Sequence, residues 1–130
     1  MTKDELYQYY YLNLEIEQLK ERIAWTDSIS KKCTQNIIST PKSKNNNDYI
    51  AELVDLKQCL KQKMLYCLKK CIAIENYIES IDDFEIRLIM VSRIIKGNSW
   101  RKVAFDIGRY DESYPRKKFH RFLKLSEKSE

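Results

Sequence analysis

The basic residues near the C-terminal end of the chain are the side chains best suited to bind a polyanion. Lys117, Arg121 and Lys124 recur at helical spacing after Ser113 and Tyr114, and side chains three or four apart share one face of a helix. The planar fork of an arginine matches two acceptors on the guanine edge in the major groove of DNA. We therefore expect Ser113, Tyr114, Lys117 and Arg121 to read base edges.

A second set of side chains lies on the flanks of this segment and just before it. Contacts from such residues to the DNA backbone provide affinity and register without reading the base sequence. The phosphate contacts that we expect are Arg101, Lys102, Arg116, Lys118, His120 and Lys124.

The positive charge of the chain is concentrated around these residues. Over residues 93–124, ten Lys and Arg residues oppose three acidic residues, which gives a local charge of +7. Residues 1–92 and 125–130 each carry a net charge of −1, so this segment holds the whole surplus behind the formal charge of +5. A surplus confined to one segment favours a polyanionic partner. A solvated basic helix without a ligand is the alternative.

The pattern before the basic segment predicts a short helix and a turn. Ser99 can accept a hydrogen bond from a backbone N–H at the start of a helix, and Gly108 can supply the positive φ at which the chain leaves it. One apolar stripe lies between them, formed by Trp100, Val103, Ala104 and Ile107. A second helix follows over 114–124, with Ser113 as its cap. This order is typical of a helix-turn-helix unit.

A supporting helix is expected before this pair. Asp82 or Asp83 would cap it, and Gly97 would end it. Its inward face is expected to consist of Phe84, Leu88, Val91 and Ile95, with Ile94 beside them. On the last helix, Phe119, Phe122 and Leu123 would face the core.

The N-terminal part of the chain predicts two long helices. The first, over 4–26, carries Tyr9, Leu12, Ile16, Leu19 and Ile23 at helical spacing. The second, over 48–80 with Asp48 as cap, holds a heptad register formed by Ile50, Leu53, Lys57, Leu60, Met64, Cys67, Cys71, Ile74, Ile78 and Ile81. Lys57 is the polar exception. Residues 27–47 are largely polar and contain Pro41, so a loop is expected there.

We therefore expect an all-α fold, since the chain has only two glycines and two prolines. A long, antiparallel, coiled-coil-like helical hairpin would occupy residues 1–80, and a three-helix helix-turn-helix unit would occupy 81–126. The hairpin seam has two interpretations. It is intramolecular core alone, or it also joins two copies of the chain in a homodimer.

Residue types for other kinds of chemistry are scarce. The four cysteines contain no CxxC pair, and His120 is the single histidine. A zinc or disulfide role for Cys67 and Cys71 stays open, but buried reduced thiols are favoured. We find no phosphate-binding glycine loop or nucleophile motif, and expect no enzyme activity, catalytic residue, metal or cofactor. The chain has no long apolar run and a polar start, so we expect a cytoplasmic protein that does not enter membranes.

Several short motifs together resemble a known family. In chain order they are Ser39-Thr40-Pro41, Leu53-Val54-Asp55-Leu56-Lys57, Tyr77-Ile78, Arg87, Gly97-Asn98-Ser99-Trp100-Arg101-Lys102-Val103-Ala104 and Gly108. Their order and spacing over residues 35–125 resemble the small phage- and prophage-encoded regulators of Gram-positive bacteria that are similar to sigma region 4, the ArpU/RinA-type late-gene activators. The resemblance implies binding of promoter-region DNA through the last two helices, and contact with host RNA polymerase. The stretch from Gly108 to Pro115 is longer here than in the family, which affects the register of the base-reading residues.

The sequence thus predicts a sequence-specific transcriptional regulator of phage or mobile-element genes, with activation favoured. Helix 114–124 would enter the major groove of double-stranded DNA. Two other classes stay open. One is a DNA-packaging recognition subunit similar to a phage small terminase, and the other is a protein-interaction module that contacts RNA polymerase without binding DNA.

Overall fold

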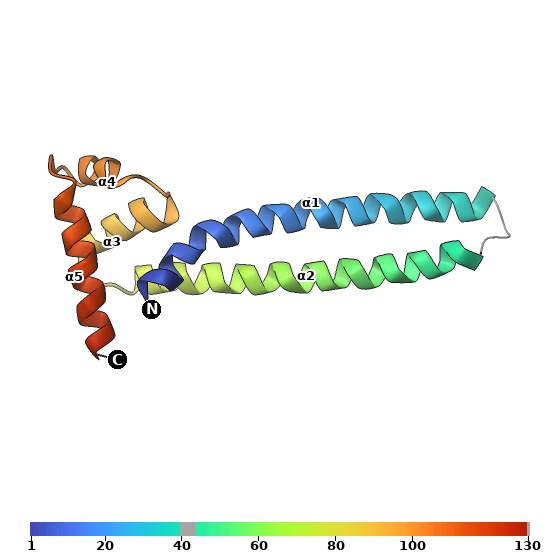
Figure 1. Ribbon diagram of the computed structural model, residues 1–130, viewed down its shortest axis with the longest axis horizontal. Coiled ribbons are helices and arrows are strands. Elements are labelled where there is room, and N and C mark those ends of the chain that lie inside the picture. Colours follow the sequence, from blue (N-terminus) through green and yellow to red (C-terminus); the bar gives the residue numbers. More distant parts are fainter. Residues whose placement is uncertain (40–43, 130) are drawn as a thin grey trace. The chain divides into compact units, whose positions relative to one another are not determined.

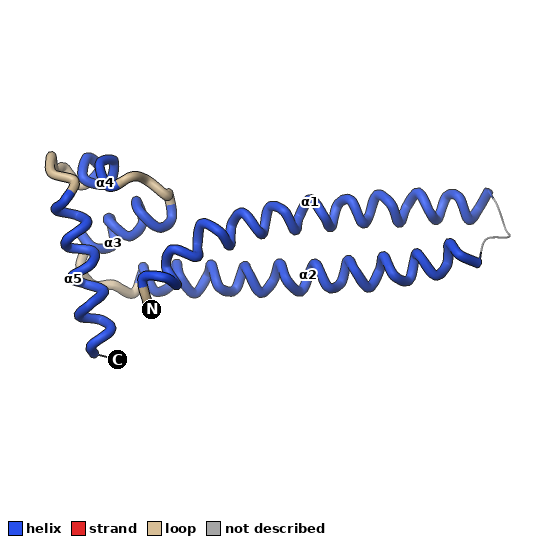
Figure 2. The backbone as a smooth tube through the Cα atoms, viewed as in Figure 1, coloured by secondary structure: helices blue, strands red, loops and turns tan. Residues whose placement is uncertain are grey.

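The structure is all-α, which confirms the predicted class. The computed structural model describes residues 1–39 and 44–129, with side chains outside 34–47. In chain order its elements are α1 (Lys3–Ser39), α2 (Lys44–Glu79), α3 (Phe84–Met90), the π-helix η1 (Val91–Ile95), α4 (Trp100–Asp106) and α5 (Ser113–Ser129) (Figure 1). No strand occurs among the described residues (Figure 2). The chain divides into two compact units, residues 14–68 and residues 1–13 with 69–130.

In the unit of residues 14–68, α1 and α2 lie side by side and run in opposite directions (Figure 1). Ile16, Leu19 and Leu60, all from the expected apolar seams, are buried between solvent-exposed neighbours. Lys57, the polar exception in the heptad register, forms an ion pair with Asp27 of α1. The one polar break in the seam is therefore compensated by an opposite charge on the facing helix.

Both long helices extend further than the sequence predicts. α1 continues to Ser39 and α2 begins at Lys44, so most of the loop expected over 27–47 is helical, and Asp48 is not the cap of α2. The residues before 40 include no glycine or proline, and a polar segment without such breakers can continue a helix whose earlier turns are packed. Pro41, the expected breaker, lies outside the described residues.

The second unit joins the start of the chain to its C-terminal part. The Tyr9 hydroxyl of α1 donates a hydrogen bond to Glu75 Oε1 of α2 at 2.6 Å. The Tyr7 ring lies edge-on to Phe119 of α5, with centroids 6.2 Å apart. Leu6 is fully buried. The first turns of α1 therefore belong to the same core as α3, α4 and α5.

α3 begins at the expected place but buries a different face from the expected one. Asp83 caps it, and its carboxylate accepts hydrogen bonds from the backbone N–H groups of Glu85 and Ile86 at 2.9 and 3.2 Å. Phe84 and Leu88, expected inside, are 75% and 59% exposed. Val91 and Ile95 are half-buried, and Ile94 is buried as expected. The buried side chains of α3 itself are Ile86, Ile89 and Met90.

The π-helix η1 connects α3 to the start of α4. The N–H of Lys96 donates to the Val91 carbonyl at 2.9 Å, a bond that spans five residues as in a π-turn. The buried Ser92 hydroxyl donates to Asp106 at 3.1 Å and accepts from the side-chain amide of Asn98 at the same distance. Wide helical turns of this kind turn side chains out of the regular register, and here the result is a polar link between η1 and α4.

Candidate nucleic-acid interface

α4 and α5 pack through the side chains that the sequence assigns to them. The Ser99 hydroxyl accepts a hydrogen bond from a backbone N–H in the first turn of α4 at 3.3 Å. Val103 is fully buried, and the Trp100 ring meets Phe119 edge-on, with centroids 5.4 Å apart. The chain leaves α4 through Gly108 at φ +76°. The expected cap, apolar stripe and glycine turn are confirmed.

Asp111, rather than Ser113, provides the side-chain acceptor at the start of α5. Its carboxylate accepts hydrogen bonds from the Ser113 hydroxyl at 2.7 Å and from the Ser113 backbone N–H at 3.0 Å. These two bonds lower the pKa of Asp111, so the carboxylate stays charged at the positive end of the helix. The Ser113 hydroxyl, expected to help read bases, is therefore engaged within the turn.

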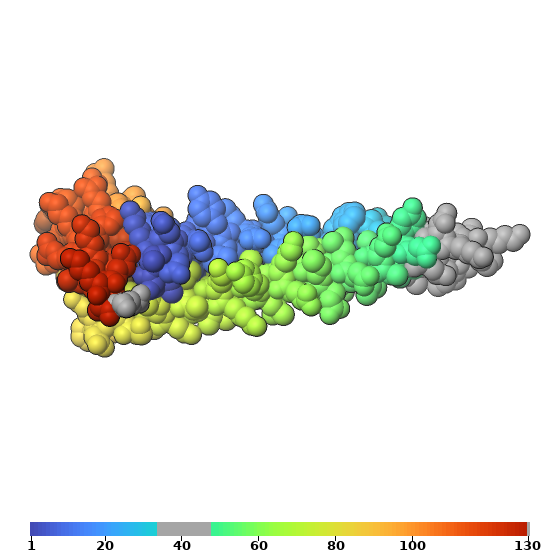
Figure 3. All heavy atoms as spheres, turned by 60° about the horizontal axis from the view of Figure 1, so that its bottom comes forward, coloured from blue at the N-terminus to red at the C-terminus, as the bar shows by residue number. Residues whose placement is uncertain are grey.

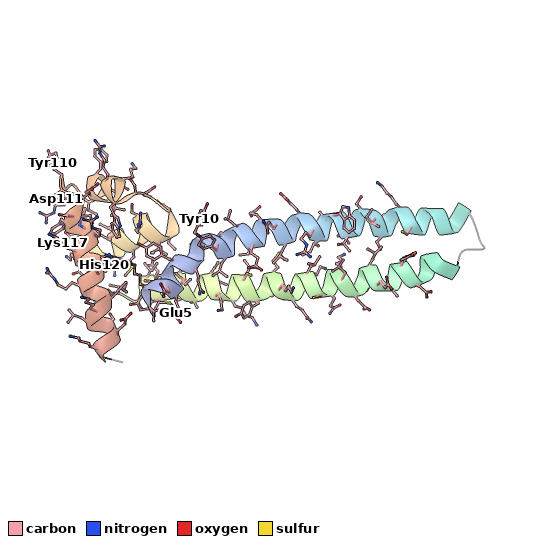
Figure 4. The ribbon with its side chains drawn as sticks, viewed as in Figure 1. Glu5, Tyr10, Tyr110, Asp111, Lys117 and His120 are labelled. Carbon is pink, nitrogen blue, oxygen red and sulfur yellow. The ribbon has the colours of Figure 1, made fainter. Side chains whose placement is uncertain are left out.

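The outer face of α5 is cationic. Arg116, Lys117, Arg121 and Lys124 are all exposed, whereas Phe119 on the opposite side is fully buried. In Figure 4, Lys117 lies on the side of α5 that faces away from the other helices of this unit. Lys117, Arg121 and Lys124 follow one another at intervals of four and three residues, so they form one ridge along the helix.

Tyr114 and Lys118, both expected at the DNA interface, instead contact the start of α3. The Tyr114 hydroxyl donates to Glu85 Oε1 at 2.6 Å, and Lys118 Nζ lies 2.8 Å from the same oxygen. Lys118 Nζ also lies 3.6 Å from Asp83 Oδ2. Tyr114 is thus a packing contact here, and Lys118 is held by Glu85 of α3 and by Asp83, the residue that caps α3.

This cluster stabilises the charged forms of its members. The hydrogen bond from Lys118, followed by the one from Tyr114, lowers the pKa of Glu85. The same bond raises the pKa of Lys118. The backbone N–H of Ile86 is the main cause of a lowered pKa at Asp83. At neutral pH, α3 and α5 are therefore joined by a fully charged contact.

Two other cations of this region also have partners within the unit. Lys102, an expected phosphate contact, lies 3.2 Å from Asp106 one turn later, although its side chain is still 55% exposed. The Arg109 guanidinium lies 4.3 Å from the centroid of the Tyr114 ring. Arg101 is exposed on the first turn of α4. A duplex would have to compete with Asp106 for Lys102, but Arg101 is accessible.

Arg93 ties three parts of the unit together. Its Nε donates to the Tyr7 hydroxyl at 3.1 Å, and its Nη1 donates to the Asn98 carbonyl at 2.9 Å. Its guanidinium also lies 4.6 Å from the centroid of the Trp100 ring. Although Arg93 counts toward the charge surplus of residues 93–124, it acts as an internal tether between α1, η1 and α4.

His120 is half-buried beside two aromatic rings. Its ring centroid is 5.4 Å from that of Phe119 and 6.4 Å from that of Trp100. Burial, and then the positive charges of Lys3, Arg116 and Lys124, lower the pKa of His120. The imidazole is therefore neutral at neutral pH in the absence of an anion.

The sequence did not identify Glu85, Arg93 or Tyr7 as parts of this region. Glu85 is separated from Tyr114 by 29 positions and Arg93 from Tyr7 by 86, so no local spacing reveals these contacts. Tyr110 was also missed, and it is fully exposed in the turn before α5 (Figure 4). An aromatic residue between Arg109 and Asp111 in a polar turn is the signal that could have drawn attention to it.

A shallow groove runs along α5 beside this cationic ridge. It has a volume of 380 Å³. Its lining combines apolar and cationic side chains, namely Ile86, Tyr114, Lys117, Lys118, Arg121, Phe122 and Leu125.

Within residues 1–39 and 44–129, no three His, Cys, Asp or Glu side chains gather in a way that could hold a metal ion. None of the described helices combines the length and the apolar character needed to cross a bilayer.

Comparison with known proteins adds no relative. No protein-family model, curated protein or solved structure matches the chain. The resemblance to the late-gene activators therefore stays a prediction, and the function has to be argued from the site itself.

Proposed function

We propose that the protein is a sequence-specific DNA-binding regulator of transcription that inserts α5 into the major groove. The observation that carries the proposal is the exposed ridge of Lys117, Arg121 and Lys124 on a helix whose opposite side is anchored in the core by Phe119 and Leu123. The major groove is wide enough to admit an α-helix. A rigidly supported cationic helix face is the geometry that such insertion requires.

The contacts of each cation suggest how the roles are divided. Arg121 and Lys117 are proposed as base readers, because both are exposed on the outermost part of α5. Arg101, Arg116 and Lys124 are proposed as phosphate contacts. Tyr114 and Lys118 are proposed to fix α5 on α3 through Glu85, so they act on DNA binding only indirectly. In this arrangement α4 is the first helix of a helix-turn-helix unit and α5 the recognition helix.

The biological setting follows from the resemblance rather than from the site. We propose that the regulated genes belong to a phage or another mobile element, that the effect is activation, and that host RNA polymerase is a second partner. A homodimer is also proposed. Apolar side chains exposed on α1 and α2 in residues 14–68, such as Trp25 and Leu65, offer a surface for it.

Selection from a random pool of duplex DNA tests the proposal directly. The protein is incubated with the pool at low and at near-physiological salt, and bound duplexes are sequenced. A discrete motif that survives the higher salt supports a sequence-specific regulator, because non-specific phosphate binding weakens steeply with salt. Enrichment that disappears at the higher salt would contradict sequence-specific recognition and leave only electrostatic attachment.

A protein-interaction module is the second candidate, and the exposed face of α3 favours it. Phe84 and Leu88 lie next to a groove of 720 Å³ whose walls include Val91, Lys96 and Ile107. Large exposed apolar side chains around a concavity often mark a protein-binding surface. If Phe84→Ser and Leu88→Ser abolish transcriptional activity but leave DNA binding intact, this face contacts a protein such as RNA polymerase.

A further inference from the structure

One flank of α5 carries a row of basic side chains that meets the outermost ridge at Lys124. Arg116, His120 and Lys124 are spaced by four residues each. A helix rises ~1.5 Å per residue, so successive members lie roughly 6 Å apart along the axis. Arg116 and Lys124 are exposed and His120 is half-buried. The row therefore presents two cations with an imidazole between them.

The start of the chain lies beside this row. The Tyr7 ring is 6.2 Å from Phe119, the residue before His120. Lys3 Nζ lies 5.9 Å from the centroid of the same Tyr7 ring. In the space-filling view, the first residues of α1 lie against α5 (Figure 3). Lys3 thus joins a cationic cluster whose other members are more than a hundred residues away in sequence.

The surroundings of His120 are apolar on one side and cationic on the other. Phe119 and Trp100 cover the ring, and the Trp100 ring in turn carries the Arg93 guanidinium. The charges that act on the imidazole are those of Lys3 from α1 and of Arg116 and Lys124 from α5. Burial first, and then these three positive charges, disfavour protonation of the imidazole, and a bound anion would offset the contribution of the charges.

We propose that Lys3, Arg116, His120 and Lys124 form a single phosphate-binding cluster, and that His120 takes up a proton when the cluster is occupied. The inference rests on the proposed function, since the phosphates in question are those of the DNA backbone beside α5. The cluster would hold one strand while Lys117 and Arg121 face the bases. It also makes the first turn of α1 a part of the DNA interface.

The direction of the pH effect follows from linkage. In the unbound protein the pKa of His120 is lowered, whereas a phosphate beside the ring favours the protonated form and raises it. Binding is then accompanied by proton uptake between the two pKa values. The affinity for DNA rises as the pH falls through this interval, and it is independent of pH above the bound-state value.

The single histidine of the chain makes the test direct, because one imidazole gives one NMR titration curve. The titration is recorded for the wild type alone, with sulfate as a simple anion, and with a short DNA duplex. We expect both additions to raise the pKa of His120, and Lys3→Gln to reduce the change. Lys20→Gln, which removes an exposed cation elsewhere on α1, should leave it unchanged.

Duplex affinity provides the second readout. A pKa rise of one unit on binding gives a tenfold difference in affinity between the low-pH and high-pH limits. His120→Gln should abolish this difference while retaining binding at high pH. Lys3→Gln should lower the salt slope by about one, if one phosphate contact is lost.

The possible results distinguish a failure of the phosphate-binding cluster from a failure of the proposed function. If duplexes bind but neither sulfate nor DNA changes the His120 titration, the cluster is wrong and the proposed function stands. If sulfate changes the titration through Lys3 but no duplex binds, the cluster is supported and the proposed function fails. An equal response of the wild type and Lys3→Gln would exclude the first turn of α1 from the site.

Discussion

Glu85 holds part of the basic segment against the protein. It accepts hydrogen bonds from Tyr114 and Lys118, and its second carboxylate oxygen lies 3.8 Å from Arg109. One acidic side chain on α3 thus keeps three residues of the basic segment in contact with the protein. The cations on the outer face, Lys117 and Arg121, are left for a ligand. Formal charge along the sequence overstates the charge that such a surface can offer.

Removing the charge of Glu85 should destabilise the unit and change its response to acid. A carboxylate with a lowered folded-state pKa contributes stability that is fully present above its unfolded value, 4.5 for Glu85, and that is lost as the pH falls through the folded value. We expect Glu85→Gln to cost about 1–2 kcal/mol at neutral pH. The difference from the wild type should shrink on acidification below the ordinary carboxyl range.

Chemical denaturation of both proteins at neutral and acidic pH measures this difference. Glu52→Gln, which removes an exposed carboxylate of α2, is the matched control. A penalty for Glu85→Gln that is the same at both pH values would show that its contacts act without the ionised carboxylate.

Arg121→Ala should relax sequence preference more than it weakens general attachment. A side chain that reads a base edge contributes about 1–3 kcal/mol of discrimination at its position, whereas a phosphate contact contributes nearly equally to every sequence. Arg116→Ala, five residues earlier in the exposed cationic set, is therefore expected to lower affinity for all duplexes. Competition assays with the selected motif and with scrambled duplexes distinguish the two effects. Equal loss of preference in both variants would contradict this division.

At the scale of elements, the sequence predicts the positions of helices more reliably than it predicts which face of each helix is buried. The stretch Phe84 to Ile95 has apolar residues at most positions, so two overlapping stripes fit a helix equally well. The structure buries Ile86, Ile89 and Met90 and exposes Phe84 and Leu88. The choice depends on long-range partners, because Glu85 and Ile86 have to face α5 while Arg93 has to reach Tyr7. No window of local sequence contains that information.

The helix pair α4 and α5 was easier to predict because its determinants are local. A serine cap, an apolar stripe and a glycine turn all lie within ten positions of one another. The prediction is wrong where two neighbouring side chains can cap the same helix, as at the start of α5. Asp111 and Ser113 can both act as acceptors for exposed N–H groups, and Asp111 takes this role because its carboxylate reaches both the hydroxyl and the N–H of Ser113.

Gly108 should be sensitive to substitution for its backbone conformation alone. Its φ is +76°, and a Cβ added there would have no heavy atom within 4 Å. Gly108→Ala should therefore destabilise the unit by about 1–2 kcal/mol through the left-handed conformation and not through a clash. Gly108→Asn should cost less, since asparagine tolerates this region better. Thermal unfolding of the two variants tests the order, and an Asn variant less stable than the Ala variant would contradict it.

At the scale of the whole molecule, the first turns of α1 complete the core around α5. Leu6 is fully buried and Tyr7 contacts both Phe119 and Arg93. The sequence predicts one hairpin over residues 1–80, and it contains no signal that residues 1–13 pack with residues 69–130. Contacts between the two ends of a chain arise from the folded arrangement, which periodicity within each helix does not specify.

Leu6→Ala should consequently lower the stability of the unit that contains α4 and α5. Truncation of a fully buried leucine costs about 2–5 kcal/mol. In a Trp25→Phe background, Trp100 is the only tryptophan, and its fluorescence reports on the unit that contains α4. We expect the Trp100 transition to shift to lower denaturant concentration. Leu14→Ala, at a half-exposed position on the same helix, should shift it little. Equal shifts would argue against a structural role of the first turns.

The position of Leu6 and Tyr7 in this core has a consequence for biosynthesis. A ribosome adds residues at ~5–20 per second and releases the N-terminal part of a chain first. These side chains emerge several seconds before Phe119 and Leu123, with which their unit is completed. Until α5 has been translated, Leu6 and Tyr7 lack the side chains of α5 that pack with them in the folded protein. The cationic interface therefore cannot be completed before α5 has been synthesised.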